Sequence, residues 1–331
     1  MIKKYIYLIL FSSFFSTSAL AENNFIPYRI NFILENDIFN STDEDYSSGE
    51  SLSAIFYINK PTNKIFDILK PLDRSDSDIY VNISITNQIY TPSDINATHL
   101  LVNDHPYAGW TFLKMGLLQS SALHLNALSI KVGMVGPSSA SDKIQYNIHK
   151  ATNSTIPNGW DHQLKDELGI NLQYLYKRHL SLDLSPTIER TITPFIEAQL
   201  GNISTSINSG FIVRMGKNIP KDFGFSNINI ANEDGIPIYG ERQNIKKEPW
   251  SFNFNVTLSA SAIARDIFLD GNTFKNSPSV EKENFVAHLG YGFSLRYKNF
   301  VFEFLGVIST KKFKTANGNH AVGTSKIAWI F

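Results

Sequence analysis

Apolar and polar residues alternate with a period of two over much of the chain. In residues 250–264, phenylalanine, valine, leucine and alanine share one parity, while serine, asparagine and threonine fill most of the other. Residues 28–35 and 284–297 alternate in the same way. Successive side chains of a β-strand point to opposite faces, so each segment predicts a strand with one apolar and one polar face. After residue 21, no stretch is long and apolar enough to predict a transmembrane helix.

The first 21 residues indicate an exported protein. Two lysines precede an apolar stretch at residues 6–15, and residues 19–21 have the small-x-small pattern Ala-Leu-Ala. This arrangement is typical of a secretory signal peptide. A membrane anchor would need about 20 apolar residues, so the apolar stretch is too short for one. We therefore expect residues 1–21 to be cleaved and residues 22–331 to form a single domain.

The composition favours a large all-β domain. The chain has 24 Phe, 14 Tyr and 4 Trp, which suits strands with a buried or lipid-facing side. Its 30 basic and 30 acidic residues balance, so bulk charge gives no indication of a nucleic-acid partner. Cysteine is absent, and disulfides cannot contribute. Stability must therefore come from burial and strand pairing, or from closure into a barrel that leaves no free edges.

We expect an all-β fold, namely a transmembrane antiparallel β-barrel of about twelve strands with a short helix in an extracellular loop. The expected strands cover residues 28–35, 49–58, 79–87, 110–119, 124–135, 169–180, 192–200, 207–215, 250–264, 284–297, 300–309 and 322–331. The alternative is a soluble β-sandwich, which also alternates. The apolar outward parity and the signal peptide favour the barrel. The terminal aromatic Phe331 also resembles the assembly signal of outer-membrane barrels.

An even number of strands places both termini on the periplasmic side of the outer membrane. Every odd-numbered connection is then extracellular, including residues 36–48, 91–109 and 136–168. These three segments are rich in polar residues, and their position on one rim predicts a site there. The long connection at residues 217–249 falls on the other side, and we interpret it as a solvated periplasmic loop.

Asn36 interrupts the apolar parity of the first strand. Tyr28, Ile30, Phe32 and Leu34 precede it on that parity. A polar side chain on a lipid-facing parity is unfavourable unless it lies at the rim or serves a function. Asn36 is therefore a candidate site residue, with a simple turn residue as the alternative.

The fifth connection contains a second candidate. Gln145 and His149 are four residues apart and would share one face of a helix, where a histidine can accept a proton from water. Helical spacing also relates Trp160, Gln163, Leu164 and Glu167, so we expect a further helical part there. The alternative is that His149 is an exposed loop histidine and Trp160 an interfacial aromatic residue.

Several short motifs follow one another along the chain. They are Leu34-Glu35-Asn36-Asp37, Asp45-Tyr46-Ser47-Ser48-Gly49, Tyr90-Thr91-Pro92-Ser93, Pro106-Tyr107-Ala108-Gly109-Trp110, Val135-Gly136-Pro137, Gln145 with His149, and Gly159-Trp160-Asp161-His162-Gln163-Leu164. In order and spacing they resemble the outer-membrane lipid A 3′-O-deacylase family, the LpxR-like enzymes. The resemblance covers nearly the whole chain after the signal peptide.

The resemblance implies a site between the outer barrel wall and a helix from an extracellular loop. It implies hydrolysis of an acyloxyacyl chain from lipid A with Ca²⁺ as cofactor. His149 matches the base that activates water, and Gln145 matches its polar partner one turn earlier. Asn36 and Asp37 match residues that position calcium and the ester carbonyl. Ser47 matches a hydroxyl position that is commonly threonine in the family, so Asn36, Asp37 and Ser47 are the implied metal ligands.

The chain departs from the family pattern at two positions that would affect substrate binding and metal affinity. Ala97 lies where some members have a lysine suited to a phosphate, and Thr155 lies where some have a carboxylate. Lys150, Lys165 and His99 are alternative phosphate contacts, although surface lysines are more often simply solvated.

Two further functions stay open at this point. A serine phospholipase would use Ser47 as the nucleophile and His149 as its base. A non-enzymatic barrel would serve as a pore or adhesin. In every case the expected location is the bacterial outer membrane. For the enzyme, we expect a monomer that acts on lipopolysaccharide.

Overall fold

The computed structural model describes residues 25–37, 45–59, 76–182, 188–225, 235–244 and 248–331. The predicted signal peptide lies outside the described residues. The strands are β1 (Phe25–Asn36), β2 (Asp45–Ile58), β3 (Ser77–Thr91), β4 (Ala108–Ser121), β5 (His124–Val135), β6 (Glu167–Arg178), β7 (Leu180–Ser181), β8 (Glu189–Gly201), β9 (Ser204–Lys217), β10 (Trp250–Asp266), β11 (Phe285–Tyr297), β12 (Phe300–Ser309) and β13 (His320–Ile330). The described helices are α3 (Ser141–Thr152) and α4 (Ile267–Asp270), with 3-10 turns at Pro137–Ser139 and Trp160–His162.

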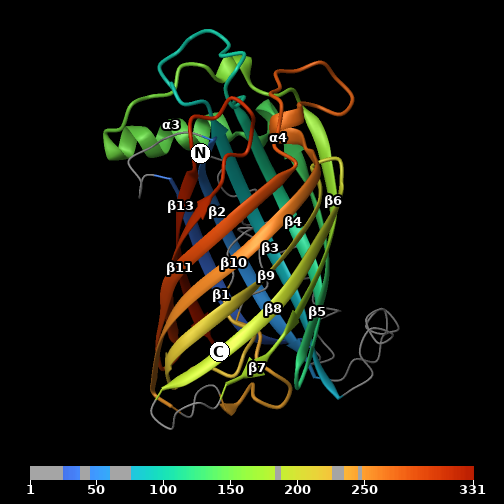
Figure 1. Cartoon of the computed structure of the whole chain (residues 1–331), viewed down its shortest axis with the longest axis vertical. Coiled ribbons are helices and arrows are strands. Elements are labelled where there is room, and N and C mark those ends of the chain that lie inside the picture. Colours follow the sequence, from blue (N-terminus) through green and yellow to red (C-terminus); the bar gives the residue numbers. More distant parts are fainter. Residues whose placement is uncertain (1–24, 38–44, 60–75, 183–187, 226–234, 245–247) are drawn as a thin grey trace, which may run out of the picture.

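The strands close into an antiparallel barrel (Figure 1). Strands that follow each other in sequence pair, except that β6 pairs with β8 rather than with the short β7, and β1 pairs with β13 to complete the ring. The two-residue β7 continues the line of β6 and pairs with the same strand, β8. The wall therefore has twelve strands, as the sequence predicted.

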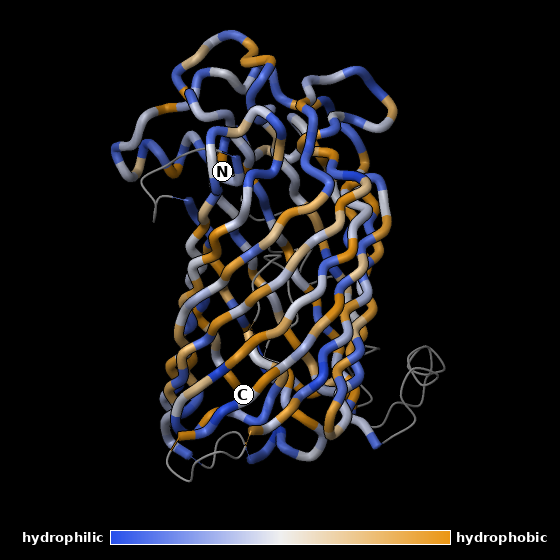
Figure 2. The backbone as a smooth tube through the Cα atoms, viewed as in Figure 1, coloured by the Kyte–Doolittle hydropathy of each residue, from blue (hydrophilic) through white to orange (hydrophobic). Residues whose placement is uncertain are grey.

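The outward face of the wall is apolar and the inward face is polar. Ile30, Phe32 and Leu34 of β1 point outward and are between 39% and 48% exposed. On β10, Phe254 is exposed, while its neighbours Asn253 and Asn255 are buried inside the barrel. Figure 2 shows the resulting alternation along the strands. This pattern is expected of a barrel that faces lipid.

By the length of its loops, the end of the barrel that carries α3 and α4 corresponds to the extracellular end of a bacterial barrel. Single-chain bacterial barrels have short periplasmic turns and longer extracellular loops. The turns at residues 122–123 and 298–299 lie at the opposite end, whereas the long connections at 92–107 and 136–166 lie at the end with α3 (Figure 1). None of the helices in the described residues is long and apolar enough to cross a membrane.

Several strands extend further toward the extracellular end than predicted. Asn36 belongs to β1, residues 45–48 begin β2, Thr91 ends β3, and residues 108–109 begin β4. The predicted bounds stopped where polar side chains begin. Backbone pairing does not depend on side-chain polarity, so the ladder continues, with Asn36 opposite Ser48.

The predicted helix around His149 is present as α3, but the second predicted helical part is wrong. Trp160 begins a single 3-10 turn, Gln163 is already extended, and Glu167 begins β6 opposite Val135. Pairing with β5 accounts for this difference because it fixes the chain in an extended form.

The connection between β9 and β10 was predicted to be solvated, and this prediction is wrong for its described parts. Phe223, Phe225, Ile236 and Ile238 are buried. Phe223, Ile236 and Ile238 join the hydrophobic cluster that includes Tyr28. The predicted outward parity of Tyr28 is wrong, because the pairing of β1 with β2 is irregular between Pro27 and Arg29 and Tyr28 is buried inside the barrel. The burial of these apolar side chains removes them from water, which outweighs the polar character of the segment as a whole.

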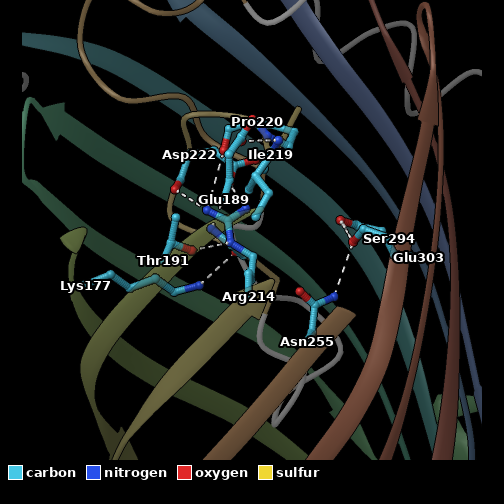
Figure 3. Close-up of polar contacts among 12 residues, drawn as sticks. Lys177, Glu189, Thr191, Arg214, Ile219, Pro220, Asp222, Asn255, Ser294 and Glu303 are labelled. Atoms are coloured by element: carbon cyan, nitrogen blue, oxygen red, sulfur yellow. Dashed lines mark hydrogen bonds and ion pairs between the residues drawn. The ribbon is translucent and has the colours of Figure 1, made fainter. Parts of the chain in front are cut away.

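Ion pairs fix this connection inside the barrel. The Arg214 guanidinium of β9 donates to Asp222 Oδ1 at 2.6 Å and to the Asp222 carbonyl oxygen at 2.9 Å (Figure 3). Glu303 of β12 contacts Arg29 at 3.3 Å and Lys326 at 3.0 Å. The periplasmic half of the lumen is therefore filled by a folded segment and by paired charges.

Candidate active site

Asn36 lies at the extracellular end of the outward face of β1. It has the same parity as Leu34 and pairs with Ser48 of β2 and Gly323 of β13. The apolar residues before it on this face are exposed, whereas Asn36 is half-buried. It lies at the rim, beyond the apolar band. The structure thus places this polar side chain where the outward wall meets the extracellular loops.

Asp37 follows at once and is 1% exposed. Its backbone amide donates to the carbonyl oxygen of Ser47 at 3.3 Å, which joins the ends of β1 and β2. Asp37 is also close enough to interact with the buried Lys312 ammonium of the β12–β13 connection. Burial lowers the pKa of Lys312, and carboxylates that include Asp45, Asp266 and Asp37 oppose that shift.

Ser47 lies at an irregularity in β2. The pairing of β2 with β3 shifts between Tyr46 and Ser48, so one residue is inserted at this point. Tyr46 points into the lumen, where its hydroxyl donates to Glu35 at 2.5 Å. Ser47 Oγ instead lies 2.5 Å from the hydroxyl of Thr91, which has the outward parity of β3. Such a bulge re-aims a side chain, and here it aims the serine hydroxyl away from the lumen.

The beginning of α3 lies against the outside of the wall at β3 and β4. Asn87 Nδ2 donates to Ser141 Oγ and to Thr111 Oγ1, each at 2.7 Å. Thr111 in turn donates to the carbonyl oxygen of Ser139 at 2.7 Å. A Cβ atom at Gly109 would lie 2.2 Å from Ser141 Oγ, so the helix can approach this closely only because position 109 is glycine.

Gln145 and His149 share one side of α3, as predicted. Gln145 is 2% exposed, and its Oε1 accepts a hydrogen bond from Trp160 Nε1 at 2.9 Å. The Trp160 ring packs on Tyr107, with ring centroids 5.0 Å apart. This contact fixes α3 to the chain that follows it.

His149 is held by a backbone carbonyl. Its Nδ1 lies 2.5 Å from the carbonyl oxygen of Thr155. Because a carbonyl only accepts, Nδ1 must carry the proton, and the lone pair of the neutral ring is then on Nε2. This orientation suits a general base. It depends on the backbone of Thr155 and not on its side chain, so the missing carboxylate at this position does not affect it.

The structure brings the predicted residues together in two groups on the same rim. Asn36, Asp37 and Ser47 adjoin at the ends of β1 and β2, and Gln145 and His149 lie on α3. The described contacts join α3 to the wall through β3 and β4. Their combined role as a catalytic set stays a prediction.

The proposed phosphate contacts lie on the surface. His99, Lys150 and Lys165 are exposed, and the Lys150 ammonium lies 5.9 Å from the centroid of the Tyr146 ring. Ala97 is half-buried where the 92–107 connection packs on the chain after α3. No described contact orients these three side chains toward a common point at the rim.

The oxygen donors at the rim fit a hard cation better than a transition metal. Within the described ranges, no three histidine or carboxylate side chains come close enough together to hold a metal ion. Asp37 offers a carboxylate, Asn36 an amide oxygen and Ser47 a hydroxyl. Calcium accepts carboxylate, amide and carbonyl oxygens together, whereas zinc prefers histidine and cysteine. The residues present therefore fit calcium through mostly neutral ligands.

Sequence reasoning missed Glu50, which lies on the outward face of β2. It pairs with Leu34 of β1 and Asn87 of β3. The signal was available, because Glu50 has the parity of the exposed Leu52 and interrupts an apolar face just as Asn36 does.

Sequence reasoning also missed a polar chamber inside the extracellular half of the barrel. Its cavity volume is about 200 Å³, and its walls include Glu35, Asp266, His288, Lys312 and His320. His105 stacks on Tyr90 there with ring centroids 5.4 Å apart, and burial lowers the pKa of His105 to about 4. This chamber lies on the opposite side of the wall from α3.

One solved structure, that of LpxR from Salmonella typhimurium, has the same overall architecture as this chain. LpxR from Salmonella typhimurium has a TM-score of 0.73 and 16% identity, covering 92% of this chain and 100% of that chain. The β domain of the Bordetella autotransporter Brka has a TM-score of 0.44 and 6% identity, over 93% of this chain and 100% of that one. The translocator domain of the autotransporter NalP from Neisseria meningitidis has a TM-score of 0.42 and 8% identity, over 92% and 89%.

No curated protein matches the chain in sequence. The family model described as outer membrane protein LpxR, however, matches residues 8–331. That match covers the whole barrel, including both groups of predicted site residues. The chain therefore belongs to the outer membrane protein LpxR family.

Proposed function

We propose that this outer-membrane barrel is a calcium-dependent hydrolase that removes the 3′-linked acyl group, an acyloxyacyl chain, from the lipid A of lipopolysaccharide. The position of α3 carries the proposal. The helix lies against the outside of the wall at the extracellular rim, with His149 on it and the polar ends of β1 and β2 on the same rim. A lipid in the outer leaflet would lie beside this outward face, with its ester groups near the polar rim.

In this mechanism His149 is the general base. Its Nδ1 proton is held by the Thr155 carbonyl, so Nε2 takes the proton from a water molecule as that water attacks the ester carbonyl carbon. The proton then passes to the leaving sugar oxygen, and the acyl chain departs as a carboxylic acid. Gln145 is a positioning residue, because its hydrogen bond to Trp160 fixes the helix that carries the base.

Asn36, Asp37 and Ser47 would hold the calcium ion. When bound, calcium supplies a positive charge that polarises the ester carbonyl and stabilises the oxyanion. Asn36 also has an amide that can orient the substrate carbonyl. Every residue in the proposal lies on one chain, so a monomer suffices.

A serine phospholipase is the second candidate. Ser47 Oγ is buried and bonded to Thr91, and no described contact joins it to His149. A serine nucleophile requires its base within hydrogen-bonding reach, so the geometry favours activated water. A pore is disfavoured by the folded segment and the Arg214–Asp222 pair that fill the periplasmic half of the lumen.

Purified barrel in detergent with lipid A as substrate tests the proposal. With calcium, we expect release of an acyl group; with a chelator, we expect that release to stop and to return when calcium is restored. Ser47→Ala should lower the rate without abolishing it. In the wild type, no acyl-enzyme should form on Ser47. A covalent acyl adduct on Ser47 would favour the serine mechanism, and full activity in chelator would exclude calcium.

A further inference from the structure

Glu50 is an acidic side chain on the lipid-facing side of the barrel. On β2 it has the same parity as Leu52, which is 46% exposed, and it pairs with the outward-facing Leu34 of β1. Its partner on the other side is Asn87 of β3, the residue that bonds to the beginning of α3. Residues directly opposite each other in a sheet have side chains in contact range. Glu50 and Asn87 therefore adjoin under the helix.

Both carboxylate oxygens of Glu50 are shielded from solvent, and neither accepts a hydrogen bond of normal geometry from the described residues. Ser48 and the backbone amide of Glu50 are close enough to stabilise a negative charge, but no basic side chain in the described ranges is among the groups that interact with Glu50. An unpaired buried carboxylate is costly, and it normally acquires a proton, a basic partner or a metal ion.

Asn87 adds a third oxygen without a donor. Asn87 is 7% exposed, and its Oδ1 has no hydrogen-bond partner in the described structure. The orientation of its amide is fixed, because Thr111 uses its own proton on the Ser139 carbonyl and must accept from Asn87 Nδ2. Oδ1 is therefore on the other edge of the amide, away from these acceptors.

Three buried oxygens on paired positions thus have no hydrogen-bond partner of normal geometry, and among the described residues no basic side chain interacts with the Glu50 carboxylate. We infer that Glu50 and Asn87 provide oxygen ligands for a divalent cation of the calcium type, bound between the outer wall and the beginning of α3. Carboxylate and amide oxygens are the ligands that calcium selects. The significance of this site for catalysis rests on the proposed function, because it would hold in place the helix that carries His149.

The competing account needs no ion. A protonated Glu50 could donate to Asn87 Oδ1, which would satisfy two of the three oxygens. The two accounts differ in one measurable respect. A cation ligand contributes to calcium affinity, whereas a protonated carboxyl group does not.

Calcium titration of the full-length barrel in detergent, by isothermal calorimetry after chelator removal, separates these accounts. Glu50→Gln keeps the shape and removes the charge, so the fold should persist, as circular dichroism would verify. We expect calcium affinity to fall on the order of 10- to 100-fold. Glu281→Gln, an exposed acid in the β10–β11 connection, is the matched control and should bind calcium as the wild type does. Glu50→Asp keeps the charge on a shorter side chain and should fall between the two.

Lipid A hydrolysis measured in parallel distinguishes this inference from the proposed function. Unchanged calcium affinity in Glu50→Gln would overturn the inference and leave the proposed function intact, as would a wild type that is active but binds no calcium at this position. An inactive wild type whose calcium binding depends on Glu50 would overturn the proposed function and support the inference.

Discussion

Buried polar groups occur on both sides of the barrel wall, but they are paired differently. In the periplasmic half of the lumen, Arg214 is matched by Asp222, and Glu303 is matched by both Arg29 and Lys326. On the outward face beneath α3, no basic side chain of the described residues is among the groups that interact with Glu50. The first set has internal charge compensation. The second set does not.

This difference distinguishes polar groups that stabilise the fold from polar groups that are suited to bind a ligand. Paired charges inside the lumen stabilise a folded plug and leave little capacity to bind anything else. Unpaired oxygens on a lipid-facing surface are unfavourable for the fold alone, because apolar residues would serve better there. Their presence beneath a helix that carries a histidine base points to a ligand.

The largest expected effect comes from breaking the luminal pairing. Asp222→Asn leaves the buried Arg214 guanidinium without its counter-charge, which should lower the free energy of unfolding by about 3–5 kcal/mol. Urea unfolding of the refolded barrel measures this. The matched control is Lys221→Ala in the neighbouring Lys221–Glu241 pair, whose lysine is 68% exposed, with an expected loss of about 0–1 kcal/mol. Equal losses in the two variants would contradict the comparison.

Low pH should lower the free energy of unfolding through protonation of His105, which is buried in the extracellular half of the barrel. Burial lowers the pKa of His105 from 6.5 to about 4, with a smaller contribution from the nearby Lys312 ammonium that Asp104 opposes. Between these values the unfolded chain holds a proton that the folded chain does not. Stability should therefore be complete above pH 6.5 and decline as the pH falls toward about 4, by on the order of 3 kcal/mol.

Urea unfolding between pH 4 and pH 7 measures that decline. His105→Gln cannot take up the proton and should show a flatter pH dependence over this range. The same slope in wild type and variant would show that other groups cause the acid sensitivity.

A smaller effect, on catalytic rate, is expected from weakening the attachment of α3 while leaving His149 unchanged. Trp160→Phe removes the hydrogen bond to the buried Gln145 Oε1 and leaves that oxygen unpaired, at a cost of about 1–3 kcal/mol. We expect kcat/KM for lipid A to fall roughly tenfold or more, with the unfolding of the barrel unchanged. Tyr146→Phe, on the exposed side of α3, is the control and should retain full activity. An unaltered rate in Trp160→Phe would show that Gln145 does not position the helix.

Much of the architecture follows from the sequence because membrane strands have strict periodicity. The twelve-stranded wall and the helix containing Gln145 and His149 were predicted from alternation and spacing. The buried plug was not, because Phe223 and Ile236 are isolated apolar residues in a polar segment. Only closure of the barrel provides the surface on which they pack.

The candidate site was also only partly predictable. Asn36 and Glu50 both interrupt an apolar parity, yet Glu50 was missed because its significance depends on a partner two strands from β1. That partner, Asn87, becomes informative only once register and the placement of α3 are known. Helical spacing at Trp160 was misleading because β6 pairing overrides a local pattern.

The central claim is that His149 activates water for lipid A hydrolysis. Mass spectrometry of lipid A tests it most directly, with the wild type and His149→Ala expressed in a host that makes unmodified lipid A, and with calcium supplied. We predict a mass loss equal to an acyl group in the wild type and none in the variant, which follows from a loss of about 10²–10⁴-fold in rate. An unchanged spectrum from a correctly assembled wild-type barrel, or the same mass loss in His149→Ala, would contradict the claim.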